Sequence, residues 1–510
     1  MTEYVVEMKH ITKRFPGIIA NDDVSISIRR GEIYALLGEN GAGKSTLMSM
    51  LFGMYEPDHG EILINGEKVE FHSSNDATAK SIGMVHQHFK LVDNYTIAEN
   101  IILGSEPMTR RFGILPWVNL KKANEEIREL SARYGLEVNP EDLIQNVPVS
   151  VRQRVEILKM LYRKAEIMIF DEPTAVLTPQ EIDFLLKIMD GLRRDGKTII
   201  LITHKIEEIK RIADRCAILR RGRLIDVRSV ANTTVQEMAN LMVGREVDLA
   251  GSKTMPEFGD VILEVEHLTV RNENKFEVVR DVSFRIRGGE IFAIAGVSGN
   301  GQTQVADAIA GLLPAYSGKI TLSGRDITTE SIRHRSEAGI SYIPEDRQGT
   351  GTILDFTLRD NLALRVYHKA PYSERGILQF DILKQYSEDL IERYDIRSGQ
   401  GADTPLRSMS GGNQQKAIIG REIEEHAKLI IFVQPTRGLD IGAIENIHRQ
   451  ILGERARGAA ILLISLELDE IMQLADTIGV IYNGELLNTA PAGEMTSQEV
   501  GRYMMGVKEE

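Results

Sequence analysis

The chain has 510 residues, of which 42% are hydrophobic and 26% charged, a composition typical of globular proteins and long enough for two or more domains. Its formal net charge of −13 argues against nucleic-acid binding, which uses a broad positive surface. Its apolar runs, such as AEIMIF, are far shorter than the roughly 18 residues of a membrane-spanning helix. The single cysteine, Cys216, excludes a disulfide within the chain and is expected to be a small buried side chain.

The sequence is an internal duplication. Two segments of 25 residues align with each other: DDVSISIRRGEIYALLGENGAGKST, which begins at Asp22, and RDVSFRIRGGEIFAIAGVSGNGQTQ, which begins at Arg280. Further segment pairs follow in the same order, at offsets between 258 and 262 residues. This order predicts a first half at 1–245, a linker at 246–258 and a second half at 259–505, and the Gly, Ser and Pro residues of LAGSKTMPEFG are typical of a linker.

Each half has a coarse pattern of short apolar β-runs that alternate with helical stretches. Runs such as EIYALLG and IMIFD predict a parallel sheet with crossover helices. The middle of each half, about 115–165 and 375–425, is more helical and charged, and NLKKANEEIRELSARYG predicts an exposed helix. Trp117 and the segment 105–120 have no assigned role and are expected to form a surface loop of this helical part.

The segment GENGAGKST follows the predicted strand EIYALL and precedes LMSMLFG, a plausible helix. This is the context of a phosphate-binding loop, in which glycines let the backbone approach phosphates and the helix N-terminus meets their negative charge. Lys44 is predicted to reach the β- and γ-phosphates of ATP, and Ser45 to ligate Mg²⁺. The predicted ATP-binding residues of this loop are Gly38, Glu39, Asn40, Gly41, Ala42, Gly43, Lys44, Ser45 and Thr46.

Two carboxylates and a histidine follow later predicted strands of the first half. IMIFDEPT places Asp171 and Glu172 at the end of an apolar run, where Asp171 suits a Mg²⁺-holding role and Glu172 can polarise an attacking water. His204 follows the strand KTIILIT, and the ends of parallel strands are where α/β sheets bind ligands. The catalytic residues predicted here are Lys44, Glu172 and His204.

In combination, the phosphate loop, Gln87 in MVHQHF, a signature segment, DEPT and the histidine resemble the ATP-binding cassette family over nearly the whole chain. The resemblance implies an α/β fold of two tandem cassettes, each a RecA-like core with an antiparallel β subdomain and a helical subdomain. It implies ATP hydrolysis coupled to transport. It also implies that Phe15 stacks on adenine, that Gln87 contacts Mg²⁺ and relays to a membrane partner, and that His204 contacts the γ-phosphate.

Cassettes of this family pack head to tail, so that each ATP lies between the phosphate loop of one cassette and the signature segment of the other. The second half has MSGGNQQK, in which Ser410, Gly411 and Gly412 suit a γ-phosphate. The first half has VPVSVRQR at this place, where Pro148 replaces the serine and lacks an N–H donor. Asp440 in the second half matches the family's acidic residue that faces the opposite site.

The second half lacks the groups that the chemistry needs. Its loop GVSGNGQTQ keeps glycines but has glutamine in place of the lysine, and loss of one preorganised charge-stabilising group costs roughly 10²-fold or more in rate. The residues of the predicted degenerate site are Gly296, Gly299, Gly301, Gln302 and Thr303, and the replacements elsewhere are Glu345, Val433, Gln434 and Leu466. We therefore expect one catalytic and one degenerate ATP site.

The fused, asymmetric layout resembles the ATPase subunits of bacterial simple-sugar and nucleoside importers. Three segments are more similar to the nucleoside importers than to the simple-sugar importers: MVHQHFKLVDNYTIAENIILGSEP, EPTAVLTPQE and ISLELDEI. The resemblance implies two integral-membrane permease subunits, an extracellular substrate-binding lipoprotein and a position on the cytoplasmic face of the cell membrane. A simple-sugar importer, of the ribose or galactose type, and a soluble tandem-cassette translation or repair factor remain as alternatives.

Overall fold

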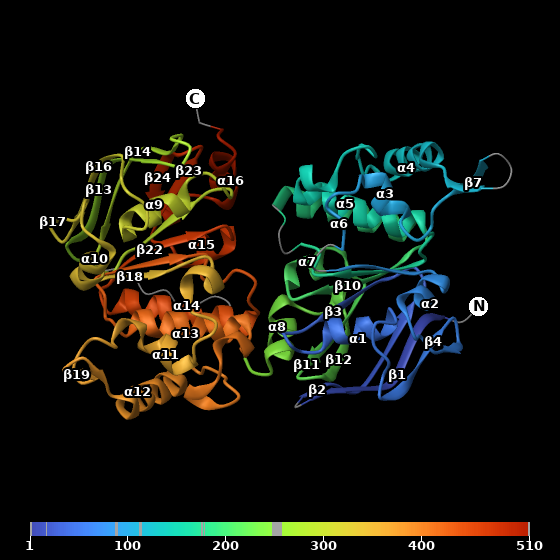
Figure 1. Cartoon of the computed structure of the whole chain (residues 1–510), viewed down its shortest axis with the longest axis horizontal. Helices are drawn as coiled ribbons and strands as arrows, with labels where there is room; N and C mark the ends of the chain where they lie inside the picture. The colour runs from blue at the N-terminus through green and yellow to red at the C-terminus, as the bar shows by residue number, and fades with distance from the viewer. Residues whose placement is uncertain are drawn as a thin grey trace. The chain divides into compact units, whose positions relative to one another are not determined.

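The computed structural model describes residues 3–16, 18–86, 90–111, 115–174, 177, 179–246 and 258–507. The chain divides into two compact units, and the boundary between them along the chain lies at Val247/Asp248 (Figure 1). The predicted linker 246–258 lies almost wholly outside the described residues, as does Gln87.

The first unit is built on a six-stranded core sheet with the order β12-β11-β3-β10-β9-β6. Five of its strands are parallel, as the sequence predicts, but the edge strand β12 pairs antiparallel with β11. Arg221 and Gly222 both have positive φ, 51° and 79°, which is the backbone of a tight hairpin turn. The strands are β3 (Ile33–Leu37), β6 (Ile82–Val85), β9 (Ile167–Asp171), β10 (Thr198–Thr203), β11 (Arg215–Arg220) and β12 (Arg223–Ser229).

The two faces of this core sheet are covered by different layers (Figure 1). Side chains alternate along each strand, so Ile33 and Leu201 pack into the core with the helical layer, while Tyr34 and Ile200 pack into the core with α1 and the antiparallel sheet. The helical layer is made of α3 (Ile97–Ile102), α4 (Leu120–Tyr134), α5 (Val149–Tyr162) and α6 (Pro179–Arg194). The opposite layer contains α1 (Lys44–Leu51), β1 (Tyr4–Phe15), β2 (Ile18–Arg29), β4 (His59–Ile64) and β5 (Glu67–Val69).

The segment around Trp117, expected to form a surface loop, is a β-hairpin of β7 (Met108–Arg111) and β8 (Leu115–Val118). Trp117 is exposed, which agrees with a surface position. Cys216 is fully buried in β11, as expected. The remaining helices of this unit are α2 (Ser74–Ala79), α7 (Ile206–Ile212) and α8 (Val235–Val243).

The second unit repeats the same architecture, which confirms the predicted duplication and the fold class. Its core sheet has the order β18-β21-β22-β15-β23-β24, equivalent strand by strand to that of the first unit. These strands are β15 (Ile291–Ala295), β18 (Ile340–Ile343), β21 (Leu429–Val433), β22 (Ala460–Ser465), β23 (Thr477–Tyr482) and β24 (Glu485–Pro491). Its antiparallel sheet contains β13 (Val261–Arg271), β14 (Glu277–Arg287), β16 (Ser317–Leu322) and β17 (Arg325–Asp326).

The helices of the second unit also fall on the two sides of its core sheet (Figure 1). On the side of the antiparallel sheet lies α9 (Gln302–Ala310). The opposite side carries α11 (Leu358–Leu362), α12 (Phe380–Arg393), α13 (Gly411–Ile423) and α14 (Ile441–Ala456). The other elements are α10 (Ile332–Ala338), α15 (Leu468–Leu474), α16 (Ser497–Met504) and a small hairpin of β19 (Ser373–Glu374) and β20 (Ile377–Leu378).

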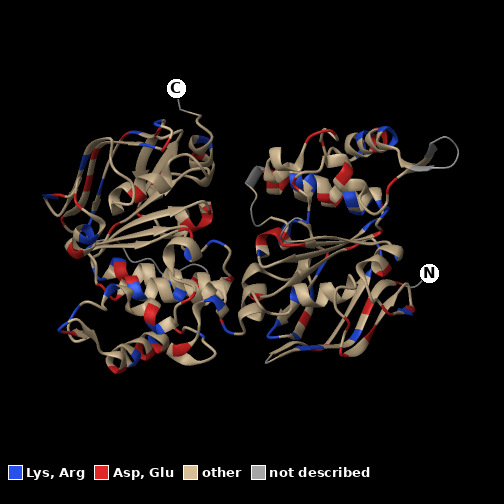
Figure 2. Ribbon diagram, in the orientation of Figure 1, with Lys and Arg blue, Asp and Glu red and all other residues tan. Residues whose placement is uncertain are grey.

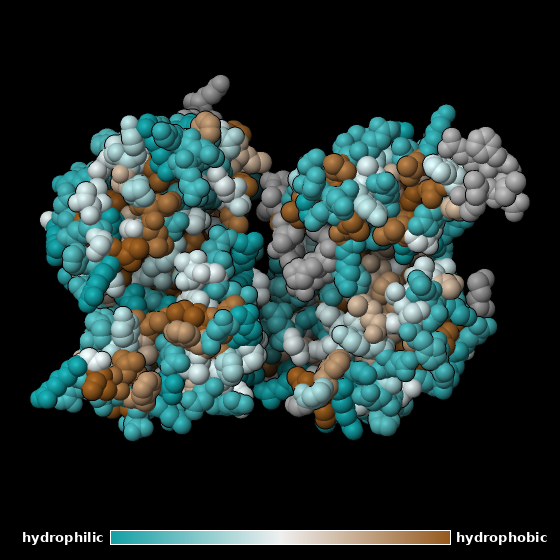
Figure 3. Space-filling view, in the orientation of Figure 1, coloured by the Kyte–Doolittle hydropathy of each residue, from teal (hydrophilic) through white to brown (hydrophobic). Residues whose placement is uncertain are grey.

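Basic and acidic residues both occur throughout the ribbons of the two units (Figure 2). The face shown in Figure 3 is mostly hydrophilic, with separate hydrophobic patches. Within the described ranges, no helix has both the length and the apolar character needed to span a membrane.

Candidate ATP site

The predicted phosphate loop lies between β3 and α1 and has the backbone of a tight cradle. Gly41 and Gly43 have φ of 80° and 97°, and Gly43 is the N-terminal cap of α1. A Cβ on Gly43 would lie 2.3 Å from the carbonyl oxygen of Ala20 in β2, so only glycine fits there. The side-chain amide of Asn21 donates to the Gly43 carbonyl at 3.2 Å, a supporting contact that no sequence motif indicated.

Lys44, the first residue of α1, folds back over this loop. Its Nζ donates to the carbonyls of Gly38 at 2.7 Å and Glu39 at 2.9 Å, and the residue is only 5% exposed. Burial lowers the pKa of its ammonium group, and the charges of Glu172 and Asp171 oppose that effect. A buried ammonium held by two backbone carbonyls is a strong attractor for a phosphate that can replace those carbonyls.

Asp171 is the last residue of β9, and its Oδ1 accepts a hydrogen bond from the Ser45 hydroxyl at 3.0 Å. Burial raises the pKa of Asp171 to about 6, against the effect of the Ser45 hydrogen bond. A bound cation would favour the charged form of such a carboxylate. Hydroxyl and carboxylate oxygens are also the ligands that Mg²⁺ prefers, so this pair fits that ion.

Glu172 follows β9 in the left-handed conformation, with φ of 46°. Its backbone N–H donates to the Ile202 carbonyl of β10 at 2.9 Å, and its Oε1 lies 3.1 Å from Nδ1 of His204. Burial would raise the pKa of Glu172, but the hydrogen bond and charge of His204, together with Lys44, outweigh it and lower the pKa. Glu172 is therefore ionised at neutral pH, as a general base must be.

The structure thus brings Lys44, Ser45, Asp171, Glu172 and His204 to one edge of the first core sheet. Phe15 ends β1, in the hairpin whose Ala20 carbonyl lies against Gly43, and its ring contacts Tyr55 edge-on at 5.4 Å.

The signature residues predicted for the second half lie at the start of α13. Ser410 is the N-terminal cap, and Gly411 and Gly412 occupy the first turn, where backbone N–H groups have no partner within the helix. The equivalent helix of the first unit, α5, is capped by Pro148, which has neither a hydroxyl nor an N–H. Asp440 directly precedes α14.

The phosphate loop of the second unit keeps the shape of the first. Gly299 and Gly301 have φ of 89° and 103°, and a Cβ on Gly301 would lie 2.4 Å from the Val278 carbonyl. Gln302 takes the place of Lys44, and its Nε2 donates to the Val297 carbonyl at 2.9 Å. The glutamine thus makes the loop-closing hydrogen bond that Lys44 makes to Glu39, but carries no charge.

The strand-end positions of the second unit keep the backbone of the first unit but carry neutral side chains. Val433 ends β21, and Gln434 has a φ of 51° and donates its N–H to the Ile464 carbonyl at 2.7 Å, as Glu172 does to Ile202. Its Oε1 accepts from the Leu466 N–H at 3.3 Å. No carboxylate or imidazole stands at these positions of the second unit, because valine, glutamine and leucine occupy them.

A groove in the first unit was not anticipated from the sequence. It has a volume of about 200 Å³ between α2, β6 and α5. Its charged or titratable lining residues are His86, Lys90, Glu156, Lys159 and Arg163. The spacing of Lys159 and Arg163, one helical turn apart, is a signal for a shared helix face, but Lys90 comes from a distant part of the chain.

Comparison with known proteins identifies the family. The family model described as ABC transporter matches residues 21–175 and 279–437. The guanosine import ATP-binding protein NupO of Bacillus subtilis is 49% identical over 99% of this chain and 98% of its own length. The nucleoside import ATP-binding protein NupA of Lactococcus lactis is 47% identical with the same coverage, and the ribose import ATP-binding protein RbsA 1 of Streptomyces avermitilis is 38% identical over 97% and 92%.

The chain therefore belongs to the ABC transporter family, as an ATP-binding subunit with two cassettes. Among solved structures, an archaeal ribosome recycling factor, aABCE1, in complex with the ribosomal stalk protein aP1 matches with a TM-score of 0.66. It covers 98% of this chain and 92% of its own at 17% identity, which shows a shared fold alone.

Two glycines of the first loop, Gly41 and Gly43, provide a matched test of the cradle. Gly41→Ala meets no atom within 4 Å and adds only left-handed strain, about 1 kcal/mol, whereas Gly43→Ala also forces Cβ against Ala20. We expect Gly43→Ala to lower the free energy of unfolding by about 2 kcal/mol more than Gly41→Ala, measured by chemical denaturation without nucleotide. Equal losses would contradict the close approach to Ala20.

Proposed function

We propose that the first cassette hydrolyses ATP, with Lys44, Glu172 and His204 as its catalytic residues. The observation that carries the proposal is the half-buried, ionised Glu172 held 3.1 Å from His204 at the end of β9, beside the phosphate loop. Glu172 orients the attacking water and accepts its proton, while Lys44 and His204 bind the γ-phosphate. The backbone of residues 38–46 binds the remaining phosphates, and Phe15 stacks on adenine.

The oxygens of Ser45, Asp171 and Gln87 are the groups that would hold Mg²⁺. The ion, when bound, neutralises the charge of the β- and γ-phosphates. The 3.0 Å contact between the Ser45 hydroxyl and Asp171 supports this assignment because it already places two oxygen ligands together. Gln87 lies outside the described residues and is assigned from its position in the sequence alone.

The signature residues Ser410, Gly411 and Gly412, with Asp440, complete this site in our proposal. Pairing is head to tail, either within one chain or between two chains. The exposed N-terminus of α13 supports the assignment, because its free N–H groups are suited to a γ-phosphate. Pro148 at the equivalent place in the first cassette could not make these contacts.

The second phosphate loop, with Gly296, Gly299, Gly301, Gln302 and Thr303, forms a degenerate site that holds nucleotide without hydrolysing it. Its glycine backbone supports binding, and the neutral Gln302, Gln434 and Leu466 support the loss of chemistry.

We further propose that the chain energises the import of nucleosides. The relatives named for guanosine and nucleoside import, at 49% and 47% identity, support this cargo over the simple sugars of the relatives at 38%. In this proposal two permease subunits form the pathway, an extracellular lipoprotein delivers the substrate, and the chain binds peripherally at the cytoplasmic face of the membrane. A translation or repair role has no support beyond the fold shared with aABCE1.

The first catalytic prediction concerns the general base. Glu172→Gln removes the one carboxylate placed to accept the proton of water, so ATP turnover should fall about a hundredfold or more with ATP binding retained. Steady-state phosphate release and nucleotide titration measure the two effects. Retention of most turnover would refute the role of Glu172, and Gln434→Ala serves as the control that leaves turnover within about twofold, because a neutral residue of the degenerate site takes no part in proton transfer.

The second catalytic prediction concerns the degenerate loop. Gln302→Ala removes a loop-closing hydrogen bond but no charge, so turnover should change by less than about threefold, since one neutral hydrogen bond contributes about 1 kcal/mol to structure. The same phosphate-release assay applies. A hundredfold loss would show that the second loop supports catalysis directly.

The cargo is tested by uptake. Cells whose chromosomal copy carries Glu172→Gln should take up labelled guanosine far more slowly than wild-type cells while ribose uptake is unchanged, because only the transport step driven by this ATPase is lost. The opposite pattern, normal guanosine and lost ribose uptake, would overturn nucleosides in favour of a simple sugar.

A further inference from the structure

The second unit has a cavity of about 810 Å³ beside its phosphate loop, within the range of roughly 300–1,000 Å³ of small-molecule sites. Thr303 lines the cavity from the first turn of α9 and corresponds to Ser45 at the offset of 258 residues. Glu345, Arg347 and Arg437 also line it. The cavity is therefore where the second cassette would meet the outer phosphates of a nucleotide, at the place that corresponds to the Mg²⁺ ligands of the first cassette.

The residues of this cavity do not fit a magnesium ion. Val433 is buried and apolar and stands where the first cassette has Asp171. Glu345, in the place of Gln87, forms an ion pair with the guanidinium of Arg437. A guanidinium bound to a carboxylate repels a divalent cation from it. Of the three groups that would hold Mg²⁺ in the first cassette, the second therefore keeps only the hydroxyl.

Arg437 is the cation that occupies this part of the second cassette. It lies in the loop after β21, and its side chain is 47% exposed, so it can reach a ligand in the cavity. Arg347 donates Nη2 to the backbone carbonyl of Arg437 and adds a second guanidinium to the cavity wall. Burial, then the charge of Arg437, lowers the pKa of Arg347. Two positive charges thus lie close together, an arrangement that a bound phosphate stabilises.

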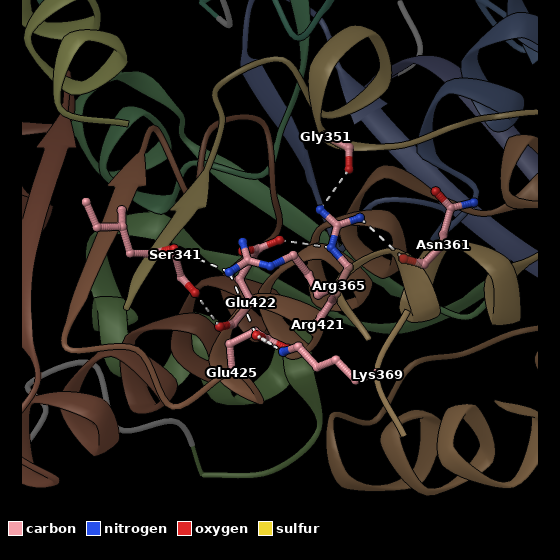
Figure 4. Close-up of polar contacts among 9 residues, drawn as sticks. Ser341, Gly351, Asn361, Arg365, Lys369, Arg421, Glu422 and Glu425 are labelled. Atoms are coloured by element: carbon pink, nitrogen blue, oxygen red, sulfur yellow. Dashed lines mark hydrogen bonds and ion pairs between the residues drawn. The ribbon is translucent and has the colours of Figure 1, made fainter. Parts of the chain in front are cut away.

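The segment that carries Arg347 is anchored from behind by buried charged residues (Figure 4). Arg347–Gly351 forms a single π-helical turn. Arg421 of α13 donates Nη2 to the Gly351 carbonyl at 3.1 Å, and its Nε donates to Glu422 Oε1 at 2.9 Å. Arg365 Nη1 donates to the other oxygen of Glu422 at 2.6 Å. The backbone that presents Arg347 is therefore fixed before a ligand binds, which lowers the entropic cost of binding.

Two further carboxylates line the cavity, and both already accept hydrogen bonds. Asp346 Oδ1 accepts the N–H groups of Gln348 and Gly349, at 3.0 and 2.9 Å. Asp307 accepts a hydrogen bond from the Tyr342 hydroxyl at 2.6 Å, and burial raises the pKa of this carboxyl against the effect of that bond. Asp346 therefore stabilises the turn in which it lies, and burial favours the neutral form of Asp307.

The alignment of the two halves shows that both arginines are specific to the second cassette. At the offsets of 258 and 262 residues, Arg347 and Arg437 replace Phe89 and Ala175 of the first. The same half has lost the lysine of its phosphate loop and the carboxylate that suits Mg²⁺. Positive charge for a phosphate is thus supplied by side chains in the half that lacks the groups for a metal ion.

We propose that the second site binds a nucleoside triphosphate without a metal ion, with Arg437 in the place of Mg²⁺. The Arg437 guanidinium binds the terminal phosphate, and Glu345 orients it. Arg347 is a positioning residue that holds the Arg437 backbone. The first site depends on Mg²⁺, because Asp171 and Glu172 place two carboxylates beside the phosphates. The inference rests on the proposed function, because it requires that the second loop binds nucleotide.

The test locates bound nucleotide on the full chain, either with Mg²⁺ or with excess EDTA. A radioactive, photoreactive azido-ATP is crosslinked over a range of concentrations, and peptide mapping assigns the label to each unit. We expect label in both units with Mg²⁺ and in the second unit alone with EDTA. Arg437→Gln should weaken the metal-free labelling of the second unit about tenfold or more, because a charge-assisted contact to phosphate is lost. Arg333→Gln, which removes an exposed arginine paired with Glu337, is the matched control and should label like the wild type.

Loss of label from both units in EDTA would overturn the metal-free inference and leave the proposed function intact. Absence of label from the second unit even with Mg²⁺ would instead overturn the proposed nucleotide-holding site. If Arg437→Gln lost ATP turnover but kept metal-free labelling, Arg437 would belong to the catalytic site, which would also contradict the inference.

Two further variants separate loss of the contact from misfolding. Arg437→Lys keeps the positive charge and should retain most of the metal-free labelling. Glu345→Gln removes the carboxylate that competes with phosphate for Arg437 and should strengthen metal-free labelling about threefold or more. Weaker labelling in both variants, as in Arg437→Gln, would contradict the inference.

Discussion

In each cassette, the side chain after the last glycine of the phosphate loop closes the loop onto one of the loop's own carbonyls. Lys44 makes this hydrogen bond to Glu39, and Gln302 makes the equivalent one to Val297, both at 2.9 Å. The glycine before it is also confined in both cassettes by a carbonyl of the neighbouring hairpin. The shape of the cradle is thus independent of the lysine charge, so a loop with a neutral glutamine keeps the same form.

The rest of the site likewise has the same backbone geometry in both cassettes, while its charged side chains differ. Glu172 and Gln434 share a left-handed backbone and a hydrogen bond to the next strand, yet only Glu172 has a histidine beside it and an ionised carboxylate. A strained position at the end of a strand persists where the surrounding structure determines it, and both core sheets supply that structure. We infer that the duplicated fold keeps its geometry in both halves while catalysis is confined to one.

The sequence alone predicted those elements of the fold that are determined by short, local patterns of residues. The duplication, the core strands, the phosphate loop and the helix at 120–134 follow from periodicity, glycine spacing and flanking residues. The antiparallel edge strand β12 and the hairpin around Trp117 were not predicted, because short β-runs carry no signal of direction or partner. The groove of Lys90, Lys159 and Arg163 needs a long-range contact between β6 and α5, which no single-sequence pattern encodes.

The central claim is that one chain contains one hydrolytic site and one site that only holds nucleotide. The most direct measurement is the nucleotide content of the chain after turnover with Mg²⁺ and ATP in the presence of orthovanadate, which traps the product at a site that has completed hydrolysis. The account predicts one trapped ADP per chain, with any second nucleotide recovered as ATP. Two trapped ADP per chain would contradict it.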